Sequence, residues 1–100
     1  MAKKKAVKAC KKGFEQLEAG NMEKAFDLFQ KSVSSDAEYL EGWRGLYMLK
    51  LKAMLEQDPE FQEQLQGKEV NYDILKEKAT DENVLEWRKE YTKEMFGYSF

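Results

Sequence analysis

The sequence predicts an all-α protein, and three observations support that prediction. Residues that favour helices (Leu, Met, Ala, Lys, Glu and Gln) are common among the 100 residues, whereas Val and Ile are scarce. Only one Pro and six Gly interrupt the chain. Apolar residues recur at steps of three and four, and no stretch alternates with period two for long enough to form a convincing strand.

The first two helices are expected to form an antiparallel hairpin. Apolar residues at helical spacing predict the first helix over residues 3–19. It is expected to end at Gly20, which suits a left-handed C-terminal cap, and Asn21 can cap a second helix that runs to about residue 34. A link of about two residues forces neighbouring helices to lie antiparallel.

A long third helix and a short fourth helix are expected next. Residues 34–36 (Ser-Ser-Asp) break the second pattern and offer caps for a helix over residues 37–56. Asp58 and Pro59 then stand at the cap and at the first position of a short helix. That short helix is expected to end at Gln66-Gly67.

Two further helices are expected in the last third of the chain. Residues 69–79 are expected to form the first of them, and Thr80 or Asp81 to cap a last helix that reaches about Phe96. The apolar line of this last helix consists of Val84, Trp87, Tyr91 and Met95. The helices within residues 59–96 are expected to cap the hairpins, and residues 97–100 to form an aromatic tail.

Length and composition predict one globular domain over residues 1–100, with 42% hydrophobic and 36% charged residues. The single cysteine, Cys10, has no partner in the chain for a disulfide. No signal-peptide core follows the lysines at residues 3–5, and no apolar run reaches the roughly 20 residues that span a bilayer. We therefore expect a soluble, cytoplasmic protein that does not enter a membrane.

Catalysis is not expected. The sequence contains no His, which is the commonest general base and the commonest metal ligand. It contains no phosphate loop and no GxGxxG, CxxC or HExxH motif. Carboxylate pairs one turn apart, such as Glu90 and Glu94, are ordinary on a solvated helix face. We expect neither an enzyme activity nor a cofactor or metal site.

Residues 13–29 resemble the middle of a tetratricopeptide repeat. That family has a small residue in its first helix, a Gly followed by Asp or Asn at the turn, an Ala five residues after that Gly and an aromatic residue four further on. Here these places are filled by Gly13, Gly20, Asn21, Ala25 and Phe29. Trp43 and Leu46 stand where a second repeat often has Trp and Leu, about 34 residues on.

The resemblance covers residues 6–56, which amount to about one and a half divergent repeats. In the second repeat Tyr47 replaces the small residue, and Pro59 falls where the Ala of the second helix should be. Repeats of this kind usually need about three units to bury a continuous core. The C-terminal helices, or a homodimer, are expected to supply the remaining burial.

The resemblance implies a groove along the first helices of successive repeats, in which a helix or peptide of a partner would lie. By position, this groove consists of Val7, Cys10, Phe14, Leu17, Glu41, Arg44, Met48 and Leu51. Arg44 would be able to hold a carboxylate of the partner. The alternative is that the C-terminal helices fill the groove, so that these residues are core. Tyr98 and Phe100 in the tail are further candidates, either inserting into a partner or folding back on the domain.

The charge distribution is uneven. Residues 1–12 hold six Lys and no acid, or +6, and the remainder holds 11 basic and 19 acidic residues, or −8. The basic segment is expected either to be solvated or to steer a partner. Nucleic acid is the less favoured partner, because the lysines have no aromatic platform or reading helix beside them.

From these features we expect a non-catalytic protein–protein interaction module. A small adaptor, a chaperone-like subunit or an inhibitor would each fit, acting on another protein through the helical groove. The alternatives are a structural homo-oligomer that forms by self-association and a regulator that binds or mimics nucleic acid through its charged faces.

Overall fold

A computed structural model describes residues 2–66 and 70–96 of the chain, and the regular secondary structure of these residues is helical, with no strand. The all-α prediction is confirmed. Within these ranges lie six helices: α1 (Lys4–Glu18), α2 (Met22–Ser35), α3 (Leu40–Glu56), α4 (Pro59–Leu65), α5 (Tyr72–Lys78) and α6 (Asp81–Phe96). The described chain measures 41 × 29 × 20 Å. No helix in these residues is both long enough and apolar enough to cross a membrane.

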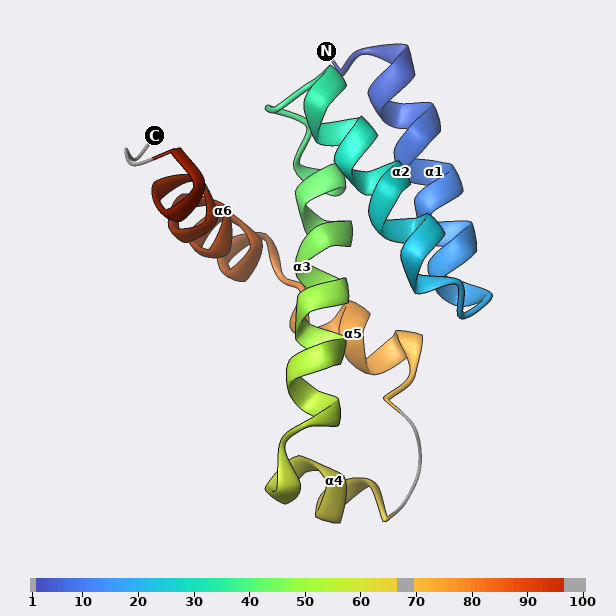
Figure 1. The fold of residues 1–100 in the computed structure, drawn as a ribbon, viewed down its shortest axis with the longest axis vertical. Coiled ribbons are helices and arrows are strands. Elements are labelled where there is room, and N and C mark those ends of the chain that lie inside the picture. The colour runs from blue at the N-terminus through green and yellow to red at the C-terminus, as the bar shows by residue number, and fades with distance from the viewer. Residues whose placement is uncertain (1, 67–69, 97–100) are drawn as a thin grey trace.

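The helices α1 and α2 form the predicted antiparallel hairpin, and α3 packs against both of them (Figure 1). The tight turn between α1 and α2 depends on Gly20, whose φ of +87° is one that residues with a side chain rarely adopt. Asn21 occupies the N-cap position of α2, as predicted, but its side chain makes no capping hydrogen bond. Its Nδ2 instead donates to Gln16 Oε1 at 2.8 Å, which ties the turn back to α1.

The third helix begins at Leu40, three residues later than predicted, and its N-cap is Tyr39 without a side-chain hydrogen bond. Residues 34 and 35 belong to α2, so they cap nothing at α3. Asp36 organises a turn instead: its Oδ1 accepts from the Glu38 backbone N–H at 3.1 Å. Because this turn uses residues 37–39, the helix cannot begin before it.

Side-chain caps fix the starts of the three C-terminal helices. Asp58 Oδ1 accepts from the N–H groups of residues 60 and 61, and Pro59 opens α4, as predicted. Gln66 ends α4 in a left-handed conformation, and Gly67 lies outside the described residues. Thr80 Oγ1 caps α6 by accepting from Asn83 N–H at 3.2 Å. The fifth helix begins at Tyr72 instead of residue 69, because Asn71 is extended and its side chain caps α5.

The hairpin closes around Phe29, which is fully buried on α2. A Cβ built at Gly13 of α1 would lie 2.6 Å from the Phe29 ring, and one built at Gly45 of α3 would lie closer still. Phe14 meets the same ring edge-on, with 4.9 Å between ring centroids. Two missing side chains therefore let three helices approach one aromatic ring.

A second apolar cluster joins α6 to α3. Trp43 and Tyr47 of α3 pack against Trp87 and Tyr91 of α6, with ring centroids 5.6–6.2 Å apart across the two helices. Val84 at the start of this line is fully buried. The predicted apolar line of α6 therefore lies against α3 over its first three members, and the side chain of the fourth lies outside the described residues.

Candidate binding groove

The C-terminal helices lie against α3 and cover part of the predicted groove (Figure 1). The helix α5 crosses near the middle of α3, and α6 lies on the side of α3 away from α1. Three residues expected in the groove, Cys10, Leu17 and Met48, are at most 4% exposed and belong to the hydrophobic core. The structure thus agrees in part with the alternative in which these helices fill the groove.

What stays open are two adjoining hollows, which together we name the Tyr72 groove. The inner hollow, of about 340 Å³, lies between α1, α3 and α5. The end hollow, of about 690 Å³, lies between the α1–α2 turn, the end of α3, α4 and the start of α5. Glu18 and Tyr72 line both hollows, so the two meet at these side chains.

Five of the eight groove residues predicted from the resemblance line this open part. Phe14, Glu41, Arg44 and Met48 line the inner hollow, and Leu17 lines the end hollow. Val7 and Leu51 are absent from both linings; Val7 is 40% exposed on α1. Cys10 lies beneath the surface, and burial raises the pKa of its thiol to about 12. Tyr98 and Phe100 lie outside the described residues.

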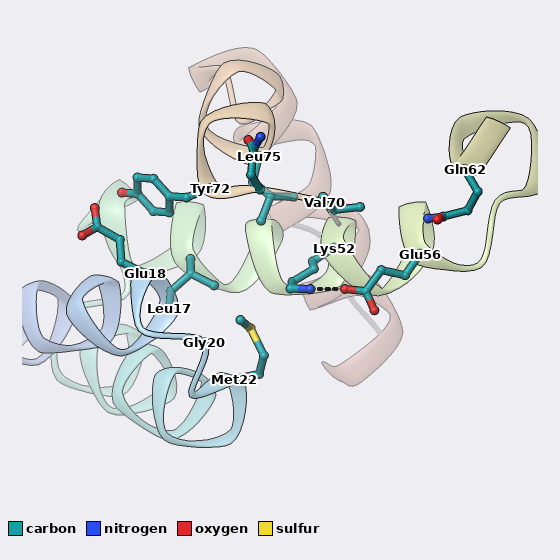
Figure 2. A pocket seen from close by; sticks show the side chains of 11 residues that line it. Leu17, Glu18, Gly20, Met22, Lys52, Glu56, Gln62, Val70, Tyr72 and Leu75 are labelled. Atoms are coloured by element: carbon teal, nitrogen blue, oxygen red, sulfur yellow. Dashed lines mark hydrogen bonds and ion pairs between the residues drawn. The ribbon is translucent and has the colours of Figure 1, made fainter. Parts of the chain in front are cut away.

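The end hollow has an apolar wall facing a charged one. Figure 2 shows Leu17 of α1 and Leu75 of α5 on one side of it, with Val70 nearby. Across the opening, Lys52 and Glu56 form an ion pair along the last turns of α3. Met22 of α2 stands beside that pair. A segment with one apolar edge and one charged edge would meet matching groups on both walls.

The rim of the inner hollow carries charges of both signs. Lys11 and Lys76 stand there with Glu15, while Tyr72 separates this hollow from the next. Burial raises the pKa of Tyr72, so its hydroxyl is neutral and can both donate and accept a hydrogen bond. Such a rim suits the backbone and mixed side chains of a peptide.

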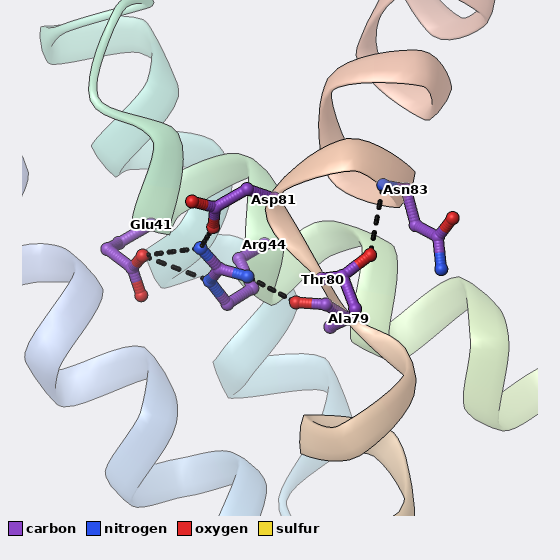
Figure 3. A network of polar contacts seen from close by, with 6 residues as sticks. All are labelled: Glu41, Arg44, Ala79, Thr80, Asp81 and Asn83. Atoms are coloured by element: carbon purple, nitrogen blue, oxygen red, sulfur yellow. Dashed lines mark hydrogen bonds and ion pairs between the residues drawn. The ribbon is translucent and has the colours of Figure 1, made fainter.

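Arg44, which we expected to be able to hold a partner's carboxylate, makes hydrogen bonds and ion pairs within its own chain. Figure 3 shows it donating to Glu41 Oε1 at 2.9 Å and to Asp81 Oδ1 and the Ala79 carbonyl oxygen. Burial opposes the charge on Arg44, but the hydrogen bonds to Asp81 and Glu41 outweigh it, and the pKa of Arg44 is raised. Arg44 of α3 therefore holds the junction between α5 and α6 against α3 through these contacts.

About half of the groove residues that the sequence did not predict lie on the part of the chain that follows α3. Tyr72, Lys76 and Leu75 belong to α5, and Gln62 belongs to α4. The hydrophobic pattern predicts those helices, but it does not say which face of α3 they cross. Lys11 and Glu18 had a signal, since each is one helical turn from a predicted groove residue of α1.

Within residues 2–66 and 70–96, no three His, Cys, Asp or Glu side chains come together as a metal ion would require. Comparison of the chain with protein-family models, with curated proteins and with solved structures gives no significant match.

Proposed function

We propose that this chain is a non-catalytic protein-interaction module that binds a segment of a partner protein in the Tyr72 groove. The observation that carries the proposal is the pair of hollows, of about 340 and 690 Å³, that meet at Tyr72 and are walled by five different helices. Apolar residues line one wall and charged residues the rim. That combination is what amphipathic peptides use when they dock in a helical groove.

The resemblance to tetratricopeptide repeats supports the same proposal. In that family ligands lie on the face lined by first helices, and here α1 and α3 both line the inner hollow. The α5 helix narrows this face but leaves a channel along it.

We also propose a cytoplasmic location, since a single cysteine buried as a free thiol suits a reducing compartment.

A photo-crosslinking residue at position 72 tests the proposal in cells of the source organism. Phe26 is the matched control position: it is also aromatic, is 42% exposed on α2 and is not among the residues that line either hollow. We expect a specific adduct from position 72 and none of the same mass from position 26. Adducts that are identical from both positions would contradict binding in the groove.

Two rim substitutions then test the captured partner with purified proteins. Glu18→Lys and Lys76→Glu reverse charges that line the groove, whereas Glu77→Lys changes an exposed residue of α5 that lines neither hollow. We expect the first two to weaken binding by about tenfold, as for partly desolvated polar contacts, and the third to leave it unchanged. Equal effects of all three would indicate a nonspecific charge effect.

A further inference from the structure

The outer face of α1 combines an exposed apolar residue with unpaired positive charge. Val7 is 40% exposed, and its neighbours one helical turn away are Lys3, Lys4 and Lys11. Lys8 lies beside them, and all four lysines are exposed; Lys11 also borders the inner hollow of the Tyr72 groove. In the part of the chain that the structure describes, no carboxylate forms an ion pair with any of these lysines. We name this the lysine face.

The lysine face opposes the stability of its own helix. The first turn of α1 holds lysines and no acid, although the N-terminus of a helix favours negative charge. Lys4 and Lys8 are also like charges one turn apart, which is unfavourable in an isolated helix. A negatively charged surface placed against this face would relieve both penalties.

The outer face of α6 has the opposite character. Leu85 is 40% exposed, and Glu82, Glu86 and Glu90 surround it on the same surface of α6. Lys89 lies among them, so three carboxylates and one ammonium give this surface a net charge of −2. Within residues 2–66 and 70–93, none of these groups belongs to an ion pair. We name this the glutamate face.

We infer that the lysine face of one copy of this chain docks on the glutamate face of a second copy. Each face has one exposed aliphatic side chain bordered by charge, and the charges are opposite. The lengths match as well: Lys4 to Lys11 spans about 10 Å of helix and Glu82 to Glu90 about 12 Å, at 1.5 Å per residue. The helices α1 and α6 lie on opposite sides of α3, so the two faces are presented by different flanks of the molecule (Figure 1).

Two observations favour a second copy over nucleic acid as the occupant of the lysine face. The phosphate backbone would satisfy the lysines but would offer Val7 no apolar contact. Outside residues 1–12 the chain carries a net charge of −8, which repels an extended polyanion such as nucleic acid. The glutamate face of a second copy is a smaller acidic surface with its own apolar residue, and it would contact only the lysine face. Because the two surfaces differ, the contact is heterologous and propagates head to tail.

Sedimentation velocity over a concentration series tests the inference. Because the charges are exposed, the association is expected to be weak and to disappear as salt rises from about 20 mM to about 500 mM, where screening is nearly complete. We expect the weight-average sedimentation coefficient to rise with protein concentration at low salt only. A coefficient that stays constant with concentration at low salt would overturn the inference.

Charge reversal identifies the two faces. One triple variant carries K4E, K8E and K11E, and the other carries E82K, E86K and E90K. We expect each variant alone to associate at least about tenfold more weakly than the unmodified chain, since three exposed pairs are lost. An equimolar mixture of the two should associate again, because each then presents a face that complements the other. Failure of the mixture to associate would show that these two faces do not meet.

Two controls complete the test. The variant K24E/K31E/K50E makes the same change in charge at exposed lysines away from the lysine face, and it should keep the association of the unmodified chain. A labelled DNA duplex of about 20 base pairs, titrated at the same low salt, tests the other occupant. Tight duplex binding by a chain that stays monomeric, and its loss in K4E/K8E/K11E, would replace the second copy with nucleic acid.

Discussion

The Phe29 ring occupies the space in which a side chain at Gly45 would stand. Ring atoms Cδ1, Cε1 and Cζ are the nearest neighbours of a Cβ built at Gly45, and Phe29 is fully buried. The same ring also faces Gly13, so α2 is held between α1 and α3 by one aromatic side chain. The hairpin and the third helix therefore depend on each other through this contact.

Gly45→Ala is expected to destabilise the chain even though Ala favours helices more than Gly does. The added methyl group forces the Phe29 ring to move in a closed core, and overpacking of this kind costs about 1–3 kcal/mol. Urea unfolding followed by Trp fluorescence measures the change. The double variant with Phe29→Leu should lose less than the sum of the two single variants, because Leu leaves room for the methyl group. Strict additivity would show that the ring and the glycine do not interact.

Arg44→Lys is expected to loosen the junction between α5 and α6. Lysine keeps the charge but cannot reach Glu41, Asp81 and the Ala79 carbonyl together, so a loss of about 1–2 kcal/mol is expected. Amide hydrogen exchange should accelerate in α6 more than in α1. Asp81→Asn serves as the comparison: the Asp81 side chain is 74% exposed, so its loss should cost less, about 0.5 kcal/mol. A larger loss of stability in Asp81→Asn than in Arg44→Lys would show that Arg44 is not the residue that holds the junction.

Cys10 is expected to resist alkylation in the folded protein. The thiol is 2% exposed and burial raises its pKa to about 12, so at pH 8 only about one thiol in 10⁴ is ionised. Labelling with iodoacetamide should therefore follow unfolding, with a rate that rises with urea concentration. Rapid labelling without urea would contradict the buried position of Cys10.

Asp36 is expected to contribute stability that is lost in acid. Its carboxylate accepts hydrogen bonds from the backbone N–H groups of Lys3 and Glu38, each at 3.1 Å, and these lower the pKa of Asp36 below its usual 3.8. Because the folded pKa lies below the unfolded one, the contribution is complete above about pH 4 and is lost as the pH falls through the folded value. Asp36→Asn should thus differ most from the unmodified chain near neutral pH.

The measurement for Asp36 is the urea midpoint between neutral pH and about pH 2.5, the range in which carboxylates titrate. The difference between the chain and Asp36→Asn should shrink toward the acid end. The control Asp27→Asn removes an exposed carboxylate in the middle of α2. A difference for Asp36→Asn that stays constant with pH would mean that these hydrogen bonds do not depend on its charge.

Local sequence patterns predicted most of the fold, because most of the fold is fixed by local chemistry. Helical spacing, Gly20 at the turn, and Asp58 and Thr80 at caps each act over one or two turns of chain. Two cap predictions failed where a side chain had more than one possible partner. Asp36 could cap a helix or organise a turn, and its contact with Lys3, 33 residues earlier, forms only in the folded chain. The Asn21 side chain likewise donates a hydrogen bond to Gln16 on the preceding helix instead of accepting one from the backbone of α2.

The groove could be predicted only in part, because half of it depends on tertiary packing. The face formed by α1 and α3 follows from periodicity and from the family resemblance. The position of Tyr72 does not, since it depends on how the chain between α3 and α6 returns across that face. Arg44 shows the same limit: its residue type suggested a site for a carboxylate, but the sequence did not indicate that Asp81 of the same chain pairs with it. Gly45 was missed because the repeat length pointed to Tyr47.

The affinity of the captured partner for the rim variants of the Tyr72 groove tests the account most directly. Fluorescence anisotropy would compare the unmodified chain with Lys76→Glu and with its neighbour control Glu77→Lys, after circular dichroism confirms equal helix content. We expect about tenfold weaker binding for Lys76→Glu and unchanged binding for Glu77→Lys. Equal affinity of all three proteins for the partner would show that the groove is not the binding site.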